Sequence, residues 1–301
     1  MSQNLKPFAQ WLTQQNRSPK TIRSYLDDAG EFLKQFGRGP TLVRREDLDK
    51  YVLELGQRPG RRSPLMTPAS VIKKFNGVSA YLRFLVYTKV IPANPADGVL
   101  LPKKPHREVV PLSRDEIELM RQVPASTFKE KLDRLVLELF YASGCRLGDL
   151  ATVKLKDYNP VTRSFQVVGK GQKQLTKRLT VGAQAMLTEY LASVQTFDRT
   201  DRPLLVYEDG ETYPRGQIYL SIKRLGKKAL PGKRVFCHLL RHTCLSHRNE
   251  AGEDLRSLQE FAGHSSPNTT ARYVHISDEQ AAKRVDEFDP DRKSQTEKEK
   301  A

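Results

Sequence analysis

The chain has 301 residues, about twice the length of a typical domain, so two domains are expected and one large domain is the alternative. Lys and Arg number 51 against 35 Asp and Glu, a formal net charge of +16. This balance favours a polyanionic partner, with nucleic acid ahead of an anionic membrane. Because no run of 18 apolar residues and no apolar signal-like start occur, membrane insertion and secretion are disfavoured.

The cysteine content points to the compartment. There are three cysteines, Cys145, Cys237 and Cys244, an odd number without paired spacing. A disulfide framework is therefore excluded, and a reducing, cytoplasmic location is expected.

The first third of the chain concentrates the positive charge and has helical patterns. Residues 1–107 contain 19 Lys/Arg and 8 Asp/Glu, a net of +11, which leaves +5 for the remainder. Helices are predicted around 8–15, from the Ser18-Pro19 cap to Gly37, around 46–55, and from the Thr67-Pro68 cap onward. Four amphipathic helices with basic outer faces predict a small bundle over 1–98 that lies on a nucleic-acid backbone, although a solvated basic surface is the plainer alternative. The expected DNA contacts are Lys20, Arg23, Lys73, Lys74, Arg83, Lys103 and Lys104.

A proline-rich segment separates this bundle from the rest. Five prolines lie between 91 and 111, around a basic cluster at 103–107, which predicts an extended linker over 99–111. Ser113 and Glu116 have capping-box spacing, so a second domain is expected over 112–288. It is predicted to be mainly α, with strands at 165–168 and 178–181 flanking a Gly-Lys-Gly turn. The charged tail 289–301 is expected to be disordered.

Two places near the middle of the chain contain candidate functional cations. An apolar helix is predicted to end at Gly144, which puts Arg146 in or before the first turn of the next helix. Taken alone, Arg146 is more simply an ion pair with Asp149 than an anion clamp. Lys170 stands between two glycines that allow a turn to approach a ligand closely, although such residues are ordinary in turns.

A third place is the segment 238–242. His238 and Arg241 lie three residues apart and share a helix face, with His242 on the same side, so they can point at one anion. A metal site formed with Cys237 and Cys244 is the alternative. It is disfavoured because four ligands on two turns of one helix cannot surround a metal, so no metal and no other cofactor are expected.

A fourth place follows a predicted helix that ends at Gly263. His264 stands directly after this glycine, and Tyr273 follows nine residues later. A single tyrosine in such a setting is usually a packing residue. The four places together, however, supply what phosphodiester transfer without a metal needs: an oxygen nucleophile, guanidinium groups, further hydrogen-bond donors and a proton donor.

The order Arg146, Lys170, His238-x-x-Arg241, His264, Tyr273 resembles the catalytic signature of the tyrosine recombinase (phage integrase) family, and it looks closest to compact, Xer-like bacterial members. Matching stretches cover 144–150, 238–243, 258–266 and 269–275. The resemblance implies a two-domain clamp, with an N-terminal SAM-like core-binding bundle and a C-terminal α+β catalytic domain. It also implies site-specific recombination by a tetramer on two double-stranded DNA sites, either of one protein or with a related recombinase, and no membrane partner.

The resemblance assigns the chemistry of cleavage to particular side chains. Tyr273 would attack the scissile phosphate and form a 3′-phosphotyrosyl link, with neither ATP nor metal. Arg146 and Arg241 would clamp the nonbridging oxygens. Lys170 would protonate the leaving 5′-oxygen.

The remaining implied roles assist these groups. His238 and His264 would donate to the developing charge or handle the nucleophile's proton, and Asp149 would orient the first arginine. The hairpin is longer than is usual in the family, which leaves Lys173 or Lys177 as fallback candidates for the acid. Residues 278–288 would form a carboxy-terminal helix that docks into a neighbouring protomer or packs on its own domain.

Three other functions remain as alternatives. A non-cleaving DNA-binding or architectural protein of the same fold would use the +16 charge equally well. A type IB topoisomerase would use the same chemistry in a single protomer. A basic metal-binding or membrane-surface protein has only the charge and one Cys/His cluster in its favour.

Overall fold

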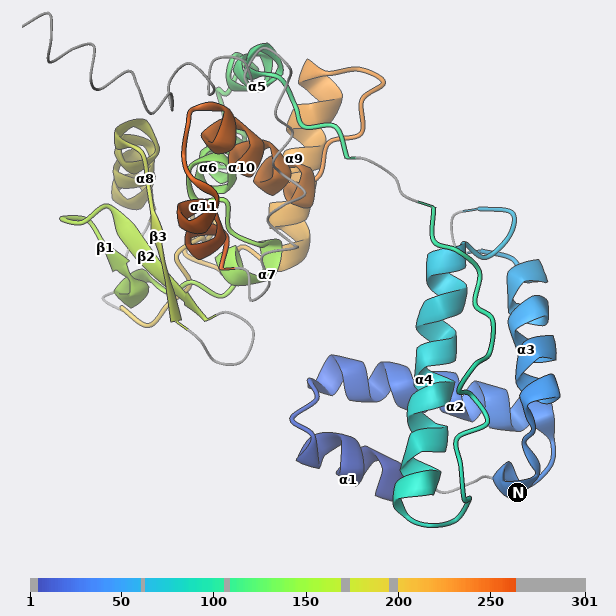
Figure 1. Ribbon diagram of the computed structural model, residues 1–301. Helices are drawn as coiled ribbons and strands as arrows, with labels where there is room; N and C mark the ends of the chain where they lie inside the picture. Colours follow the sequence, from blue (N-terminus) through green and yellow to red (C-terminus); the bar gives the residue numbers. More distant parts are fainter. Residues whose placement is uncertain (1–4, 61–62, 106–108, 169–173, 195–199, 264–301) are drawn as a thin grey trace, which may run out of the picture. The chain divides into compact units, whose positions relative to one another are not determined.

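The computed structural model describes residues 5–60, 63–105, 109–168, 174–194 and 200–263 (Figure 1). The chain divides into two compact units, Met1–Glu108 and Val109–Ala301, and each is described by itself. The narrower limits expected from the sequence, 1–98 and 112–288 with a linker at 99–111, remain predictions. The tail 289–301 lies outside the described residues.

The first unit is helical, and its helices begin where local capping signals stand. It comprises α1 (Lys6–Gln14), α2 (Pro19–Phe36), the 3-10 turn η1 (Pro40–Leu42), α3 (Arg45–Gln57) and α4 (Pro68–Tyr87). Ser18 Oγ accepts a hydrogen bond from the Thr21 amide at 3.2 Å, and Thr67 Oγ1 accepts one from the Ser70 amide at 3.3 Å. Gly37 ends α2 with a φ of 68°, in the left-handed region that favours glycine. The predicted limits of α2 and the predicted start of α4 are therefore confirmed.

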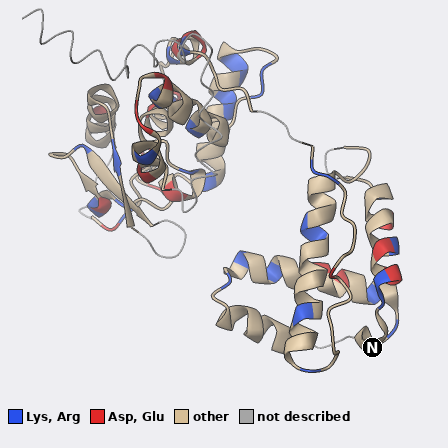
Figure 2. Ribbon diagram, in the orientation of Figure 1, with Lys and Arg blue, Asp and Glu red and all other residues tan. Residues whose placement is uncertain are grey.

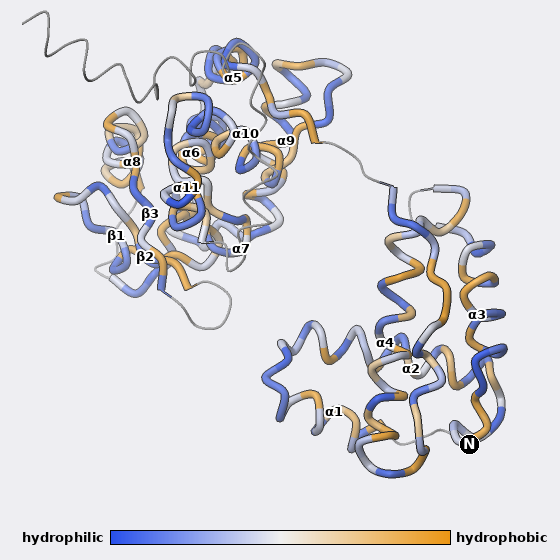
Figure 3. Tube along the Cα trace, in the orientation of Figure 1, coloured by the Kyte–Doolittle hydropathy of each residue, from blue (hydrophilic) through white to orange (hydrophobic). Residues whose placement is uncertain are grey.

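The core of this unit forms where α2 and α4 touch. A Cβ at Gly77 of α4 would lie 2.6 Å from Cβ of Asp28, so only glycine allows the two helices to come this close. Rings of α1 and α4 pack beside this crossing, with Phe8 and Tyr81 edge to face at 5.3 Å. Figure 3 shows hydrophobic and hydrophilic residues alternating along these helices, as expected of elements that bury one side.

The second unit is mainly helical and contains a small sheet. Its elements are α5 (Arg114–Arg121), α6 (Phe128–Ser143), α7 (Leu147–Leu150), η2 (Leu155–Asp157), β1 (Tyr158–Asn159), β2 (Ser164–Val168), β3 (Gln174–Arg178), α8 (Val181–Ser193), α9 (Arg215–Ala229), α10 (Cys237–Glu250) and α11 (Leu255–Ala262). The capping box of Ser113 and Glu116 is confirmed at the start of α5. Within the described ranges, no helix of either unit is long and apolar enough to cross a membrane.

The strands correct one prediction. The sheet is antiparallel in the order β1-β2-β3, with Phe165 paired with Lys177, so the second strand of the hairpin is 174–178 and not 178–181. The strand ends at Arg178, and two residues later Thr180 caps α8, where its Oγ1 accepts a hydrogen bond from the Ala183 amide at 3.2 Å. The two-residue strand β1 was not predicted, since it is too short to show a period.

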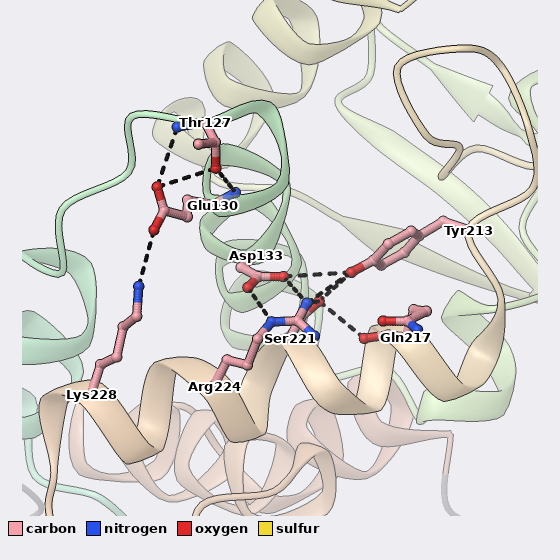
Figure 4. Close-up of polar contacts among 8 residues, drawn as sticks. All are labelled: Thr127, Glu130, Asp133, Tyr213, Gln217, Ser221, Arg224 and Lys228. Carbon is pink, nitrogen blue, oxygen red and sulfur yellow. Dashed lines mark hydrogen bonds and ion pairs between the residues drawn. The ribbon is translucent and has the colours of Figure 1, made fainter.

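A polar junction holds α6 against α9 (Figure 4). Asp133 of α6 is buried and accepts two hydrogen bonds from Arg224 of α9, at 2.7 Å from Nε and 2.5 Å from Nη2. The hydroxyls of Tyr213 and Ser221 lie 2.8 Å apart beside this pair. One turn away, Lys228 donates to Glu130 at 3.0 Å. These charge pairs hold the first two turns of α6 against α9.

Candidate active site

The site begins at the C-terminal end of α6. Gly144 ends this helix in the left-handed conformation, with a φ of 56°, as the sequence predicts. A Cβ at Gly144 would lie 2.9 Å from the Phe261 ring and 3.3 Å from Sγ of Cys244, so a side chain would also be crowded there. The chain therefore turns sharply, with α10 and α11 packed close around the turn.

Arg146 occupies the N-cap position of α7. Its amide donates to Oδ2 of Asp149 at 3.2 Å, and its Nη1 lies 3.8 Å from the same oxygen. The arginine side chain is 39% exposed, whereas that of Asp149 is 13% exposed. Asp149 thus binds the main-chain amide of Arg146 and leaves the guanidinium accessible to a ligand. Arg146 can therefore form an ion pair with Asp149 and bind an anion as well.

Arg146 and His238 line one cleft of about 380 Å³ between α7, α9 and the start of α10. Two residues of α9, Arg215 and Tyr219, line it as well. Sequence reasoning missed this pair. Its only sequence signal is the four-residue spacing of Arg215, Tyr219 and Lys223, which puts all three on one side of a helix.

Arg241 lies on the same helix as His238 but is buried, with 1% of its surface exposed. Its Nη1 donates to the carbonyl of Gly144 and its Nη2 to the carbonyl of Ala262, both at 2.6 Å. The guanidinium therefore ties the end of α6 to the end of α11. A planar fork held at two points has a fixed direction, which a flexible ammonium would not have.

The electrostatics of the cleft favour an anion. Desolvation of the ring lowers the pKa of His238 below its ordinary value, and the positive charges of Arg241 and Arg146 lower it further. His238 is therefore mostly neutral at pH 7 in the free protein. His242, one turn along α10, is half-buried, and its Nδ1 lies 3.3 Å from Oγ of Ser246.

The cysteines near the site are poor metal ligands. Burial raises the pKa of Cys145 to about 11 and those of Cys237 and Cys244 to about 12, so the thiols stay protonated at neutral pH. In the part of the chain that the structure describes, no group of three or more His, Cys, Asp and Glu side chains could hold a metal ion. The absence of a metal from the chemistry remains a prediction.

Helix α11 brings the chain to the last part of the predicted signature. Gly263 ends α11 with a φ of 63°, as the sequence predicts, one residue before His264. His264 and Tyr273 lie outside the described residues, as do Lys170, Lys173 and the expected helix 278–288. The structure thus brings Arg146, Asp149 and His238 to one cleft, with Arg241 buried one turn behind His238.

The expected DNA contacts of the first unit differ in their surroundings. Figure 2 shows the basic residues distributed over its helices. Lys74 is only 23% exposed, because it forms ion pairs with Glu31 and, at 3.9 Å, with Asp28. The other candidates are exposed: Lys20, Arg23, Lys73, Arg83, Lys103 and Lys104.

Comparison with known proteins accounts for this arrangement. Residues 110–280 match the model of the phage integrase family. The chain is similar to tyrosine recombinase XerC of Myxococcus xanthus, with 30% identity over 91% of this chain and 92% of the relative. It is also similar to tyrosine recombinase XerC of Vibrio cholerae, with 28% identity over 96% of this chain and 93% of the relative.

Solved structures share the fold at low sequence identity. The Tn1549 transposon integrase in complex with transposon right end DNA aligns with a TM-score of 0.71 and 16% identity, over 93% of this chain and 98% of that one. The XerH site-specific recombinase bound to palindromic difH substrate aligns with a TM-score of 0.70 and 16% identity, over 90% and 80%. From the family match and from the relatives aligned over nine-tenths of its length, the chain belongs to the phage integrase family and is an Xer-like tyrosine recombinase.

Proposed function

We propose that this tyrosine recombinase performs site-specific DNA recombination with Tyr273 as its nucleophile and with Arg146, Arg241, His238, His264 and Lys170 around the scissile phosphate. The observation that carries the proposal is the cleft that Arg146 and His238 both line, with the guanidinium of Arg241 held in a fixed direction behind it. A phosphodiester brings one negative charge to a place where two guanidinium groups already lower the pKa of a histidine. Such a site is preorganised for an anion.

The reaction exchanges one phosphate ester for another. The phenolic oxygen of Tyr273 forms a bond to phosphorus while the bond from phosphorus to the 5′-oxygen breaks, and Lys170 supplies the proton that the leaving oxygen needs. The 5′-hydroxyl of a partner strand then attacks the phosphotyrosine and restores the backbone. Because the energy of the ester is retained, neither ATP nor a metal is needed for the balance.

Each of the other groups has a task that suits its chemistry. Arg146 and Arg241 bind the nonbridging oxygens as planar forks that stay protonated. His238 and His264 donate hydrogen bonds to the transition state or accept the proton of the tyrosine. Asp149 orients Arg146 by accepting a hydrogen bond from its main-chain amide.

Duplex DNA is the proposed substrate, bound by four protomers on two sites. The solved relatives support DNA as the substrate, since one is in complex with transposon right end DNA and another is bound to difH substrate. The exposed cations of the first unit would contact the backbone, and Arg215 would add a contact at the mouth of the cleft. A non-cleaving binder is not favoured, because the chain retains every residue type that the transfer needs. A relaxing topoisomerase is not favoured either, because the chain resembles Xer recombinases over almost its full length.

A suicide-substrate assay tests the proposal. Nicked duplexes from the genomic neighbourhood of the coding sequence are incubated with the protein in the presence of a chelator, and denaturation-resistant adducts are counted. The wild type is expected to form an adduct, and Tyr273→Phe is expected to bind the same duplex without forming one. An adduct that survives in Tyr273→Phe would refute the assignment of the nucleophile. Tight binding without any wild-type adduct would favour the non-cleaving alternative.

A further inference from the structure

Strand β3 contains a lysine at a position that faces the core. Leu175 and Lys177 share the inward face of the strand, while Thr176 and Arg178 are exposed. Lys177 is 1% exposed and pairs across the sheet with Phe165, which is fully buried. Desolvating an ammonium is costly, and an apolar side chain would fill this place without that cost. The burial of a charged side chain at Lys177 must therefore be compensated by specific contacts.

The ammonium of Lys177 binds the end of the helix that leads to His264. Its Nζ donates a hydrogen bond to the carbonyl of Phe261 and lies 4.9 Å from the centroid of the Phe261 ring. Arg241 takes the next carbonyl, that of Ala262, at 2.6 Å. The last carbonyls of a helix have no partner within the helix and form its negative end, so two cations there are favourable partners.

Strand β3 also packs against the residue that ends this helix. A Cβ at Gly263 would overlap the side chain of Leu175, so the strand and the turn are in close contact. Gly263 immediately precedes His264 in the sequence, and β3 begins one residue after the segment 169–173, which contains Lys170. Strand β3 therefore contacts the residue before the second proposed histidine and continues the chain from the segment of the proposed acid.

We infer that Lys177 is a positioning residue for cleavage: its buried ammonium fastens β3 to the Phe261 carbonyl in the last turn of α11 and so sets Lys170 and His264 relative to Arg241. This inference rests on the proposed function, because it takes the roles of those three residues from there. It gives Lys177 a role other than that of the general acid, which the proposed function assigns to Lys170, because the Lys177 Nζ is engaged with a main-chain carbonyl.

The charge of Lys177 depends on pH in the range of an ordinary assay. Burial lowers the pKa of Lys177 to about 8, and the positive charge of Arg241 acts in the same direction, whereas the negative charge of Asp149 acts in the opposite one. Cys145 and Cys244 would also raise this pKa as thiolates, but their thiols stay protonated near pH 8. Arg248 of α10 also faces this region, with its guanidinium carbon 3.9 Å from the centroid of the Phe261 ring. Above about pH 8 the ammonium loses its proton, and its hold on α11 weakens.

A leaving group that needs no proton separates positioning from acid catalysis. In a suicide duplex with sulfur in place of the bridging 5′-oxygen, the thiolate departs unprotonated. The cleavage rate on this substrate therefore does not depend on the general acid. On the oxygen substrate, Lys170→Ala and Lys177→Met are both expected to cleave about 10²-fold more slowly than the wild type. On the sulfur substrate, Lys170→Ala is expected to recover, whereas Lys177→Met keeps its full defect. Recovery of Lys177→Met would overturn the inference, and so would a wild-type rate on the oxygen substrate.

Two further variants exclude a merely structural defect. Lys131→Met is a matched control, because Lys131 is exposed and its Nζ lies 3.7 Å from an exposed carboxylate of Glu189; it is expected to cleave at the wild-type rate. Lys177→Arg keeps the charge at every pH. On the sulfur substrate, the wild-type rate is expected to fall as the pH rises through about 8, and Lys177→Arg is expected to show no such fall. The same fall in both proteins would overturn the inference.

The design keeps this inference separate from the proposed function. Tyr273→Phe is expected to form no adduct with either substrate, and an adduct there would refute the nucleophile whatever Lys177 does. If Lys177→Met does not fold, the comparison of the two substrates is made with Lys177→Gln, whose shorter, uncharged side chain loses the contact between the ammonium and the Phe261 carbonyl. An equal loss on both substrates would then support positioning, and recovery on sulfur or a wild-type rate on both would overturn it.

Discussion

The two units of this protein use positive charge in opposite ways. In the first unit, Lys20, Arg23 and Arg83 are exposed on the helices. In the second unit, Arg241 and Lys177 are each 1% exposed, and both donate to main-chain carbonyls. An exposed cation acts through a high dielectric and is screened by salt, whereas a buried one acts at full strength from a fixed place.

This difference separates two functions of the same residue types. Exposed cations add affinity for a polyanion in small, similar increments, so any one of them can be replaced. Buried cations set the geometry in which a single phosphate is transferred, so each is needed individually. The contrast predicts large effects on cleavage from the second unit and modest effects on binding from the first.

The largest effect is expected from Arg241→Lys. A lysine cannot donate to the Gly144 and Ala262 carbonyls and to a phosphate as one rigid fork, so single-turnover cleavage should fall about 10²- to 10³-fold while DNA binding persists. The rate is measured with a suicide duplex at saturating protein. Arg146→Lys, at a position 39% exposed, is the matched comparison and should lose less. If Arg241→Lys cleaves at a rate within tenfold of the wild type, the buried cations of the second unit are not needed individually, and the contrast with the exposed cations of the first unit is wrong.

A smaller effect should separate the neighbouring residues Lys73 and Lys74. Lys73→Ala should reduce the slope of log affinity against log salt concentration by about 0.9 and should change stability less than Lys74→Ala, because the Lys73 charge acts on Asp28 without forming an ion pair with it. Lys74→Ala removes an ion-pair partner of buried Asp28 and leaves Glu31 with Arg58 alone, so it should reduce the free energy of unfolding by about 1 kcal/mol and change the salt slope less. Salt-dependent binding and urea unfolding of both variants provide the measurement. If the two variants have equal salt slopes and equal free energies of unfolding, the difference in burial between Lys73 and Lys74 has no functional consequence.

The smallest expected effect is a shift in the titration of His238. Its pKa lies below the ordinary value in the free protein, and a bound phosphate should raise it by offsetting the charges of Arg146 and Arg241. Between the lowered pKa and about 6.5 the unfolded chain binds more protons than the folded one, so stability at this site falls as the medium is acidified through that window. NMR titration of the ring in Tyr273→Phe, with and without DNA, tests the shift, and His238→Gln assigns the signal. If DNA leaves the pKa of His238 unchanged, His238 does not lie beside the bound phosphate.

Local signals made much of the fold predictable. Ser18, Thr67 and Ser113 begin helices, and Gly37, Gly144 and Gly263 end them, because caps depend on hydrogen bonds and backbone angles within a few residues. The signature of candidate residues could likewise be read in order along the chain, and the family match agrees with the resemblance drawn from it. The end of the hairpin was misplaced, since strand pairing and the cap of α8 compete over the same few residues.

The chain sequence on its own was enough to place the helix ends, the basic first unit and the recombinase signature, because those features depend on neighbours in the chain. Only the tertiary structure buries Lys177 and bonds it to a carbonyl 84 residues away, and only the tertiary structure bonds Arg241 to a carbonyl 97 residues away. It also brings Arg215 to the cleft. No periodicity encodes such contacts, because they join elements whose separation along the chain bears no relation to their distance in space. Whether a cation is screened by water or held in a dry junction is decided by that packing, and its chemistry follows from its surroundings.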